Sequence, residues 1–439
     1  MKFTRKQIVI LLAGAVLVIV IGFVFYYATK KPVTGPAVTL SMWGTDDAVA
    51  MSDLAAQYGA YRPGVTMTYT QVAPADYEAK LLKALAAGTG PDVFEIGNRS
   101  MPRWKSVLAP MPTSTFGATF NVAVMNQYFP SVVASDFTTL GGAIYAVPLS
   151  IDTLAMFYNK DYFDTAGVAL PPTTWNDFDA LIPRLRQLDA QNQIVRAAVA
   201  LGGTRMSMSH AEDLVYLLML QNGTKMTSDD RTYATFASGG TTAQAAVDFY
   251  LQFSNAGSPY YTWNDSMGDA LTSFATGKSA VYFGYHADLA TIKTKAPFLN
   301  IGIAPMPQPT VATGQAATAV NFPNYLGLAA AKQGKSAYAW DFIIYSTAYA
   351  AGENLYLKDS GAPAAQRLAI GTQQLQSLDQ ALGIFATQAL SARSWYEADD
   401  VQIDSVFDTT LQNILNGSQD VHTALRTAED SVTAAMRNH

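Results

Sequence analysis

The stretch GGAIYAVPLSIDTLAMFYNKDYFDTAGVALPPTTWNDF, from Gly141 to Phe178, decides the fold of this chain because it combines strands and helices in an unusual order. A glycine turn precedes a short apolar strand over 144–147, and a second apolar run predicts another strand over 153–158. Asn159 then caps a helix, since its side-chain oxygen can accept from the first backbone N–H groups. After two prolines, Thr174 and the acid three residues later form a capping box that opens an amphipathic helix. This order of elements is specific enough to compare with known families.

Three further blocks extend the comparison beyond this stretch: LSMWGTDD (Leu40–Asp47), KALAAGTGPDVFEIGN (Lys83–Asn98) and SFATGKSAVYFGYHADL (Ser273–Leu289). In order and spacing, the four blocks resemble the extracellular solute-binding proteins of sugar ABC importers, the maltose-binding-protein-like group. The resemblance implies a two-lobed periplasmic-binding-protein-like fold (type II) whose lobes close by a hinge on a carbohydrate, and we expect an oligosaccharide. It further implies that the chain crosses between lobes more than once, that the permease subunits of the importer are partners, and that the protein is not an enzyme.

Composition is consistent with a large globular protein outside the cytoplasm. With 439 residues, of which 49% are hydrophobic and 14% charged, the chain can bury two separate cores. It contains no cysteine. Disulfides, thiolate nucleophiles, iron–sulfur clusters and the lipidated cysteine that tethers many binding proteins are therefore excluded.

The N-terminus predicts a different tether. Residues 8–28 carry no charge, and 21 helical residues at about 1.5 Å each span a hydrocarbon core of about 30 Å. Three positive charges precede this segment, which favours a cytoplasmic stub, and residues 32–36 form a short linker. We expect a single-pass anchor in the cell membrane, with the soluble domain extracytoplasmic. A cleaved secretory signal is the alternative, but the apolar run is long and ends in bulky residues.

Charge argues against nucleic acid as a partner. Residues 1–31 contain five Lys or Arg and no acid, so without them the net charge falls from −6 to −11. An acidic exterior domain repels a phosphate backbone. We expect a monomer that binds a small ligand.

Strands and helices alternate from residue 38 to residue 96, which predicts a doubly wound α/β lobe. We expect each lobe to contain a mostly parallel sheet with helices on both faces. The predicted first lobe comprises residues 37–149 and 304–345, and the second comprises 150–303 and 346–439.

Motifs that would indicate an enzyme or a cofactor are incomplete. The Gly277-Lys278-Ser279 triplet lacks the first glycine of a phosphate-binding loop, and no dinucleotide fingerprint follows Gly88. The four histidines form no HExxH pair. We therefore predict no cofactor, no metal and no catalytic residue.

A sugar site needs flat aromatic surface for the pyranose ring and fixed polar groups for its hydroxyls. The resemblance places such residues in the matching blocks and in later loops, at the edges where the lobes meet. The predicted ligand-binding residues are Trp43, Thr45, Asp46, Asp47, Asn98, Asp152, Trp263, Tyr285, His286, Asn321, Asn324, Tyr325, Trp395 and Tyr396.

Several of these residues have a structural alternative. Asp46 or Asp47 could simply cap the helix that begins at residue 48, and Asp152 could stabilise a turn. Large aromatics such as Trp395 are commonly buried in a core. Two other functions also remain open: a glycoside-active enzyme that uses Asp46 and Asp152 as its carboxylates, and a scaffold protein that has lost its ligand site. A solute other than a sugar is a further alternative.

Overall fold

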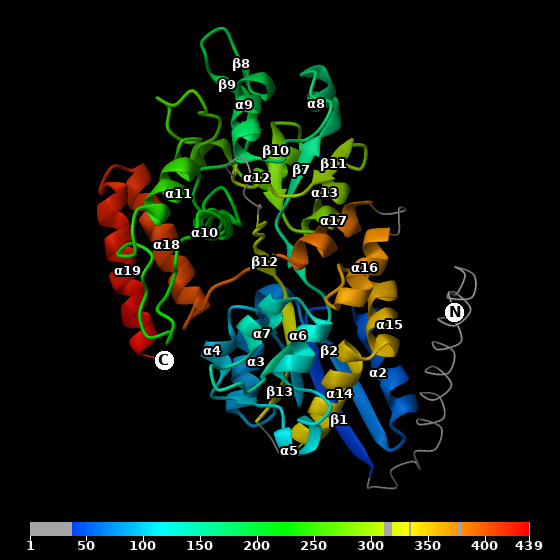
Figure 1. Ribbon diagram of the computed structural model, residues 1–439. Helices are drawn as coiled ribbons and strands as arrows, with labels where there is room; N and C mark the ends of the chain where they lie inside the picture. The colour runs from blue at the N-terminus through cyan, green and yellow to red at the C-terminus, as the bar shows by residue number, and fades with distance from the viewer. Residues whose placement is uncertain (1–36, 311–317, 333–334, 376–379, 439) are drawn as a thin grey trace, which may run out of the picture.

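The computed structural model describes residues 37–310, 318–332, 335–375 and 380–438. The predicted cytoplasmic stub, anchor helix and linker, residues 1–36, lie outside the described residues. Within the described part of the chain, no helix is both long and apolar enough to cross a membrane. Figure 1 shows two lobes, one above the other, with α18 and α19 along one flank of the upper lobe.

The first lobe is built on a six-stranded mixed sheet. Five strands follow the order β2-β1-β3-β13-β4, and β5 lies off this path and pairs with β13. Strands β1, β2 and β3 are parallel, whereas β13 runs antiparallel to β3, β4 and β5. The strands are β1 (Val38–Gly44), β2 (Val65–Gln71), β3 (Val93–Gly97), β4 (Leu108–Ala109), β5 (Ala146–Pro148) and β13 (Leu326–Ala331).

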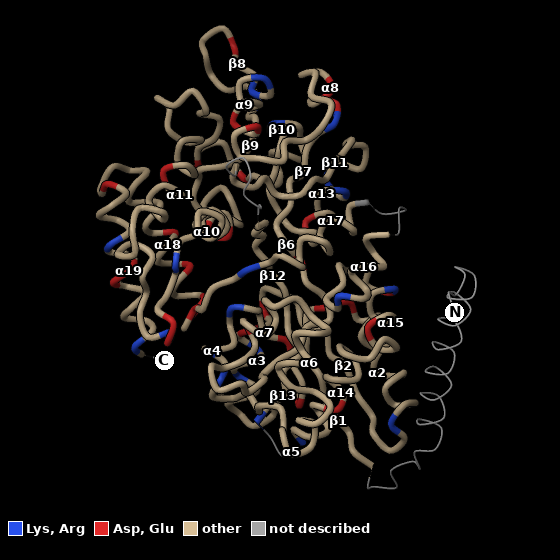
Figure 2. Tube along the Cα trace, in the orientation of Figure 1, with Lys and Arg blue, Asp and Glu red and all other residues tan. Residues whose placement is uncertain are grey.

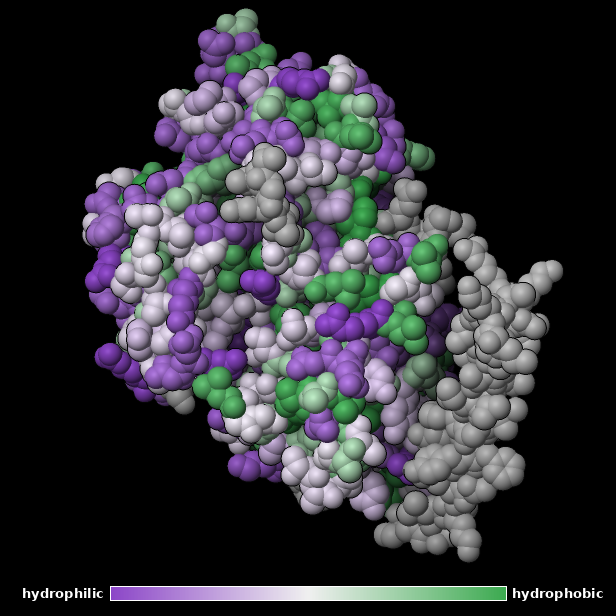
Figure 3. Space-filling model, viewed as in Figure 1, coloured by the Kyte–Doolittle hydropathy of each residue, from purple (hydrophilic) through white to green (hydrophobic). Residues whose placement is uncertain are grey.

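Helices complete the first lobe, whose buried apolar residues form one continuous cluster. They are α2 (Ala48–Tyr61), α3 (Pro74–Ala86), α4 (Met101–Trp104), α5 (Thr113–Phe116), α6 (Val122–Tyr128), α7 (Ser131–Phe137), α14 (Ser336–Ala348), α15 (Ala350–Ser360) and α16 (Arg367–Leu375). Helix α2 begins where the sequence predicts, and Asp47 is its N-cap. The lower lobe also exposes separate apolar patches among polar residues (Figure 3).

The second lobe has its own five-stranded sheet, in the order β11-β7-β10-β9-β8. Only β9 and β10 are parallel, while the other pairs are antiparallel. The strands are β7 (Ala155–Asn159), β8 (Gln187–Leu188), β9 (Ile194–Val199), β10 (Ser279–Gly284) and β11 (Ile301–Ala304). The expectation of mostly parallel sheets is therefore wrong for both lobes, because three of the five strand pairings in the first sheet and three of the four in the second are antiparallel. In the second sheet β7 runs antiparallel to both of its neighbours, since the chain enters it from the other lobe and not from a right-handed βαβ unit.

The helices of the second lobe surround this sheet and bury a second apolar cluster. They are α8 (Lys160–Thr165), α9 (Trp175–Leu185), α10 (Ala211–Gln221), α11 (Thr242–Leu251), the 3₁₀ turn η1 (Asp265–Met267), α12 (Ala270–Ala275), α13 (Asp288–Lys295), α18 (Asp400–Leu415) and α19 (Val421–Arg437). Both predicted caps are confirmed. The Asn159 side chain accepts from two N–H groups of α8, and Thr174 accepts from Asp177 N.

Three segments carry the chain between the lobes. The first leads from β5 through β6 (Asp152–Thr153), the second contains β12 (Pro323–Asn324), and the third follows α17 (Gln380–Ala389). Strands β6 and β12 pair with each other, and Asn321 bridges to Ala392. The crossings therefore lie side by side, as a hinge between two lobes requires.

The boundaries differ from the predicted ones in two places. Residues 346–375 pack with the first lobe, since Tyr356 and Ile370 belong to its buried cluster and α15 lies against α2. Residues 305–310 and 318–322 also differ, since Met306 and Phe322 are buried in the second-lobe cluster. A helical pattern in the sequence reports an apolar face but does not say which sheet buries it, so these crossings could not be located from periodicity.

Candidate functional site

The loop after β1 supplies four of the predicted residues, and the structure gives them different tasks. Trp43 lies in β1 and packs, partly buried, against the first-lobe core. Thr45 donates its backbone N–H and its hydroxyl to Glu95 Oε2, at 2.7 and 3.0 Å. Asp46 Oδ2 accepts from the Tyr356 hydroxyl at 2.9 Å. Asp47 caps α2 through Val49 N and Ala50 N, so its structural alternative is the one observed.

Glu95, which the sequence analysis missed, lies beneath this loop with only 1% of its surface exposed. Burial raises the pKa of its carboxyl, and the neighbouring charge of Asp46 raises it further. Burial also raises the pKa of Asp46, against the effect of the Tyr356 hydrogen bond. Burial and the charge of Asp46 together favour the protonated form of Glu95. Gly44 allows Glu95 to approach, because a Cβ there would lie 2.1 Å from Glu95 Oε1.

The end of β3 holds a buried polar cluster around Asp136 of α7. Asn98 Nδ2 donates to Asp136 Oδ2 at 3.2 Å, and the Tyr325 hydroxyl donates to the same oxygen at 2.7 Å. The Ser394 hydroxyl, from the third crossing, donates to Asp136 Oδ1. Burial raises the pKa of Asp136 to about 6 even though these three hydrogen bonds lower it. Asn98 and Tyr325 thus lie together, and Ser394 links their cluster to the third crossing.

Arg99, the next residue, reaches from the first lobe into the second. Its Nη1 donates to Glu397 Oε2 at 2.9 Å and to Asp404 Oδ1 at 2.8 Å, and its Nη2 lies 3.4 Å from Asp213 Oδ1. Tyr216 also donates to Asp404 Oδ1, at 3.0 Å. Burial by itself would lower the pKa of Arg99, but the three carboxylates outweigh it and the pKa is raised. The guanidinium is therefore firmly charged.

Asp152 joins the hinge to the second lobe. Its carboxylate accepts from His286 N at 2.9 Å, Ala287 N at 3.1 Å and Thr153 N at 2.8 Å. Burial raises the pKa of Asp152 to about 7, while these N–H groups act in the opposite direction. Asp152 thus orders the turn that leads into α13. This role is close to the turn-stabilising role that the sequence offered as the alternative to ligand binding. The ring of His286 lies against Phe385, with ring centroids 5.4 Å apart.

Tyr285 lies in the same region and is 2% exposed. Its hydroxyl donates to Asp213 Oδ2 at 2.8 Å, and its ring meets that of His210 edge-on at 4.8 Å. His210 Nε2 is 3.2 Å from Asp288 Oδ2. Burial opposes protonation of His210, but the hydrogen bond and the charge of Asp288 outweigh burial, so the pKa of His210 is raised. Through Asp213, this group is continuous with the partners of Arg99.

The predicted tryptophans differ in their placement. Trp395 lies edge-on to Tyr216 at 5.4 Å, is 7% exposed, and its Nε1 has no hydrogen-bond partner among the described residues. Trp263 is fully buried in the second-lobe core, where its Nε1 donates to Ser207. The prediction of a stacking face at Trp263 does not fit this placement. The buried aromatic fills the core, which is the commoner fate of such residues.

The remaining predicted residues lie along the crossings. Asn321 is buried and its side chain donates to Ser391 Oγ at 2.8 Å. Asn324 is exposed and pairs with Asp152 in the β6–β12 ribbon. Tyr396 is half-buried beneath Arg231, whose guanidinium carbon is 5.0 Å from the ring centroid. Asn321 therefore holds the hinge together, and Asn324 is the more accessible of the two.

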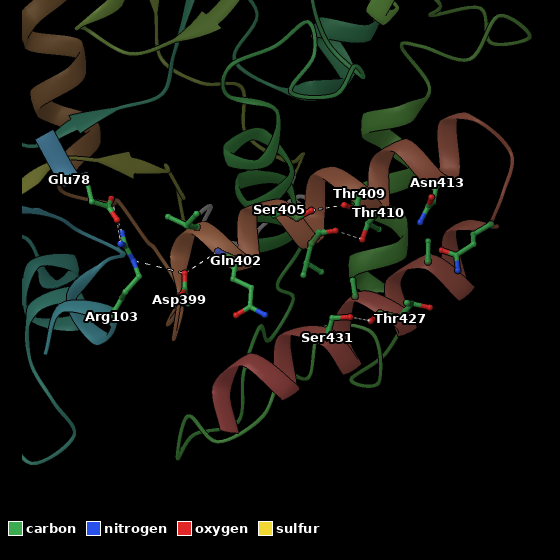
Figure 4. Close-up of a pocket in the computed structure, with 15 residues that line it drawn as sticks. Glu78, Arg103, Asp399, Gln402, Ser405, Thr409, Thr410, Asn413, Thr427 and Ser431 are labelled. Carbon is green, nitrogen blue, oxygen red and sulfur yellow. Dashed lines mark hydrogen bonds and ion pairs between the residues drawn. The ribbon is translucent and has the colours of Figure 1, made fainter. Parts of the chain in front are cut away.

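A cavity of ≈ 510 Å³ lies beside this region, between α18 and α19 (Figure 4). Glu78 and Arg103 of the first lobe reach one end of it. The hydroxyls of Thr409 and Thr410 donate to carbonyls of their own helix, which leaves them as acceptors. None of the described lining residues is aromatic or among the predicted site residues. The cavity is therefore less suited to a pyranose ring than the lobe contact is.

The residues that sequence reasoning missed are the ionic ones: Glu95, Arg99, Asp136, His210, Asp213, Glu397 and Asp404. Arg99 could have been found, because it follows Asn98 at the carboxyl end of a strand, where ligands bind in α/β sheets. Asp213 and Asp404 are single acids on helices and give no such signal.

Comparisons with known proteins agree on one kind of relative, namely binding proteins. A model of bacterial extracellular solute-binding proteins matches residues 53–373. A Brucella abortus (strain 2308) protein named as a binding protein is 27% identical over 264 residues, 58% of this chain and 59% of its own length. The mannitol-binding protein of Pseudomonas aeruginosa is 24% identical over 248 residues, 56% and 53% of the two chains. The match thus spans less than two thirds of the length of these relatives.

Solved structures share the two-lobed fold. The cyclic alpha-maltosyl-1,6-maltose binding protein from Arthrobacter globiformis has a TM-score of 0.76 at 18% identity, over 92% of this chain and 100% of its own. The sugar-binding protein MalE from Xanthomonas citri has a TM-score of 0.71 at 21% identity, with 91% and 98% covered. UgpB from Mycobacterium tuberculosis, in complex with glycerophosphocholine, has a TM-score of 0.70 at 19% identity, with 92% and 99% covered. Because the family model matches residues 53–373, which is more than half of the chain, the chain belongs to the bacterial extracellular solute-binding protein family.

Proposed function

We propose that this protein is the membrane-anchored receptor of an ABC importer, which binds a carbohydrate where its two lobes meet and delivers it to the permease. The observation that carries the proposal is the group of polar residues at the end of β3, opposite the second lobe and beside three chain crossings. A solute that touches both lobes favours their closed arrangement, and the permease can recognise that arrangement.

The donors and acceptors at the lobe contact favour a ligand with many hydroxyls. Trp395 offers an indole N–H that has no partner among the described residues, and the carboxylates of Asp213 and Asp404, which already accept from Tyr285 and Tyr216, act only as acceptors. A sugar hydroxyl can both donate and accept, so it suits this combination. The named ligands of relatives include maltose derivatives and mannitol, which supports a carbohydrate or polyol. Glycerophosphocholine in one relative keeps a phosphodiester as the alternative class.

The rival enzymatic function would use Asp46 and Asp152. Both carboxylates are engaged, Asp46 by a tyrosine hydroxyl and Asp152 by three backbone N–H groups. Neither arrangement resembles a general acid facing an open substrate site. Binding without turnover is therefore the function that the geometry favours.

A thermal-shift screen of the full-length chain in mild detergent tests the proposal. Mono-, di- and oligosaccharides, polyols and glycerophosphodiesters would be compared, and each hit would be checked for hydrolysis. Binding to the native state adds about 2.7 kcal/mol at a hundred times the dissociation constant, which gives a readable shift. A sugar that raises the melting temperature and is recovered intact supports the proposal. A cleaved product would instead indicate a glycoside-active enzyme. A melting temperature that no solute changes would favour a scaffold protein.

The anchor is proposed from residues 8–28, whose length and lack of charge suit a bilayer. Alkaline carbonate extraction of membranes from expressing cells tests it. An anchored protein stays in the membrane pellet, whereas a variant without residues 1–36 is released. Recovery of the full-length chain in the soluble fraction would contradict the anchor.

A further inference from the structure

We propose that Arg99 is an inter-lobe latch, that is, a first-lobe arginine held in a second-lobe carboxylate socket. Its ion pairs stabilise the closed arrangement of the lobes even when no solute is bound. The carboxylate socket comprises Asp213, Glu397 and Asp404. The inference deepens the proposed function, because it concerns what regulates opening and closing at the same site.

The first argument is the connectivity of the contacts. Arg99 follows β3 of the first lobe, whereas Asp213 lies on α10 and Asp404 on α18 of the second lobe. Glu397 lies at the end of the third crossing and is 1% exposed. The partners are 114 to 305 residues away from Arg99 in the sequence. Separation of the lobes would break every one of these ion pairs.

The second argument is burial. The side chain of Arg99 is 16% exposed, and those of its three partners are between 0% and 18% exposed. The guanidinium carbon lies 5.5 Å from the Tyr216 ring centroid and 5.8 Å from that of Phe322. Both rings belong to the second-lobe core. Arg99 is thus seated inside the other lobe, where water screens its charge only weakly.

The third argument is a second contact on the same turn of chain. The Ser100 hydroxyl donates to Asp400 Oδ2, and Arg103 Nε donates to Asp400 Oδ1 at 2.8 Å. Asp400 and Asp404 are one turn apart on α18, so their like charges repel unless arginines stand opposite. Figure 2 shows acidic segments at the start of α18 on the side that faces the first lobe.

These contacts predict the effect of removing the charge. Without Arg99, the closed arrangement would bury Glu397 with no cation beside it, which is strongly unfavourable. Asp404 and Asp213 would keep only the more distant Arg205, at 3.6 Å, and His210, at 3.8 Å. Opening would return the carboxylates to water. Arg99→Gln should therefore shift the lobes toward the open arrangement.

Distance measurements between spin labels on the full-length protein, in mild detergent and without solute, test the latch. The chain has no cysteine, so labels can be placed at Lys83→Cys on α3 and Ala434→Cys on α19, both exposed. We expect one short-distance population for the otherwise unchanged protein. In Arg99→Gln the ratio of long to short distances should rise at least about tenfold, as expected for the loss of hydrogen bonds between charged groups.

The matched control is Arg62→Gln. Arg62 makes a bidentate pair with Asp341, at 2.7 and 2.6 Å, entirely within the first lobe. It should leave the distances unchanged. If Arg99→Gln does not fold, Asp404→Asn removes one wall of the socket from the other side and should give a smaller shift in the same direction.

Two outcomes would overturn the latch: distances in Arg99→Gln and Asp404→Asn equal to those of the unchanged protein, or an unchanged protein that already shows the long distance. The measurement needs no solute, so its result is independent of the ligand screen. If the distances do not change in the variants but a sugar binds, the latch is rejected and the receptor function is supported. If the distances change but no solute binds, the latch is supported and the receptor function is rejected.

Discussion

The pH dependence of stability offers a quantitative check on the electrostatics of the first lobe, at Glu353 of α15. This residue is 2% exposed, and its Oε1 accepts from Gln366 N at 2.9 Å. Burial raises the pKa of Glu353 from 4.5 to about 8, and the single hydrogen bond offsets only part of that rise. Below pH 4.5 the carboxyl is protonated in both the folded and the unfolded chain, so it causes no loss of stability.

Between pH 4.5 and about 8 the unfolded chain has lost this proton while the folded protein keeps it. Since the folded state then binds more protons, the free energy of unfolding decreases as the pH rises. The decrease is at most about 1.4 kcal/mol for each pH unit, or about 5 kcal/mol over the whole window. Glu353→Gln keeps the shape and an acceptor oxygen but does not titrate. Relative to the unchanged protein, its stability should therefore increase with pH.

Urea unfolding at pH 5, 6, 7, 8 and 9, followed by tryptophan fluorescence, measures this difference. The control is Asp53→Asn, because Asp53 is exposed on α2 and its removal takes away a charge without touching a buried carboxyl. The difference in the free energy of unfolding between this control and the unchanged protein should not vary with pH. A difference for Glu353→Gln that is also independent of pH would refute the reasoning, since it would mean that Glu353 titrates alike in both states.

Three substitutions test packing and the hinge by the same unfolding measurement. Trp263→Ala should cost about 3–5 kcal/mol because it empties a fully buried site in the second-lobe core, and an unaffected protein would contradict that burial. Gly44→Ala should cost about 1–3 kcal/mol because its Cβ would meet Glu95 Oε1 at 2.1 Å, whereas Gly371→Ala, with open space around it, should not destabilise. Asp152→Asn should cost about 1–3 kcal/mol, since one amide oxygen cannot accept from all the N–H groups that the carboxylate serves. Equal stability of this variant and the unchanged protein would mean that the turn into α13 does not depend on Asp152.

Local patterns predicted the elements of this protein well, because their causes lie within a few residues. Helix α2 begins at residue 48, as predicted, and β1 begins at residue 38, where the alternation of strands and helices was expected to start. The cap at Thr174 needs only the N–H group three residues later. The family resemblance rests on the same kind of information, namely the order and spacing of short blocks.

Tertiary structure decided the lobe boundaries and most of the candidate site. The residues of α15 show almost no amphipathic pattern, and only packing against α2 assigns that helix to the first lobe. The sequence does not distinguish Trp263 from Trp395 as a stacking face, and the structure buries both in the second-lobe cluster. They differ in their indole N–H groups, since that of Trp263 donates to Ser207 whereas that of Trp395 has no partner among the described residues.

The sequence by itself therefore determined the class of fold, the family and the order of elements, since periodicity, caps and turns act over short distances along the chain. The Arg99 socket depended on the tertiary structure. Its carboxylates lie 114 to 305 residues from Arg99 in the sequence, and nothing local at Asp213 or Asp404 indicates which cation will stand opposite. Electrostatic partners are chosen by proximity in space, which the chain acquires only when both lobes have folded and met.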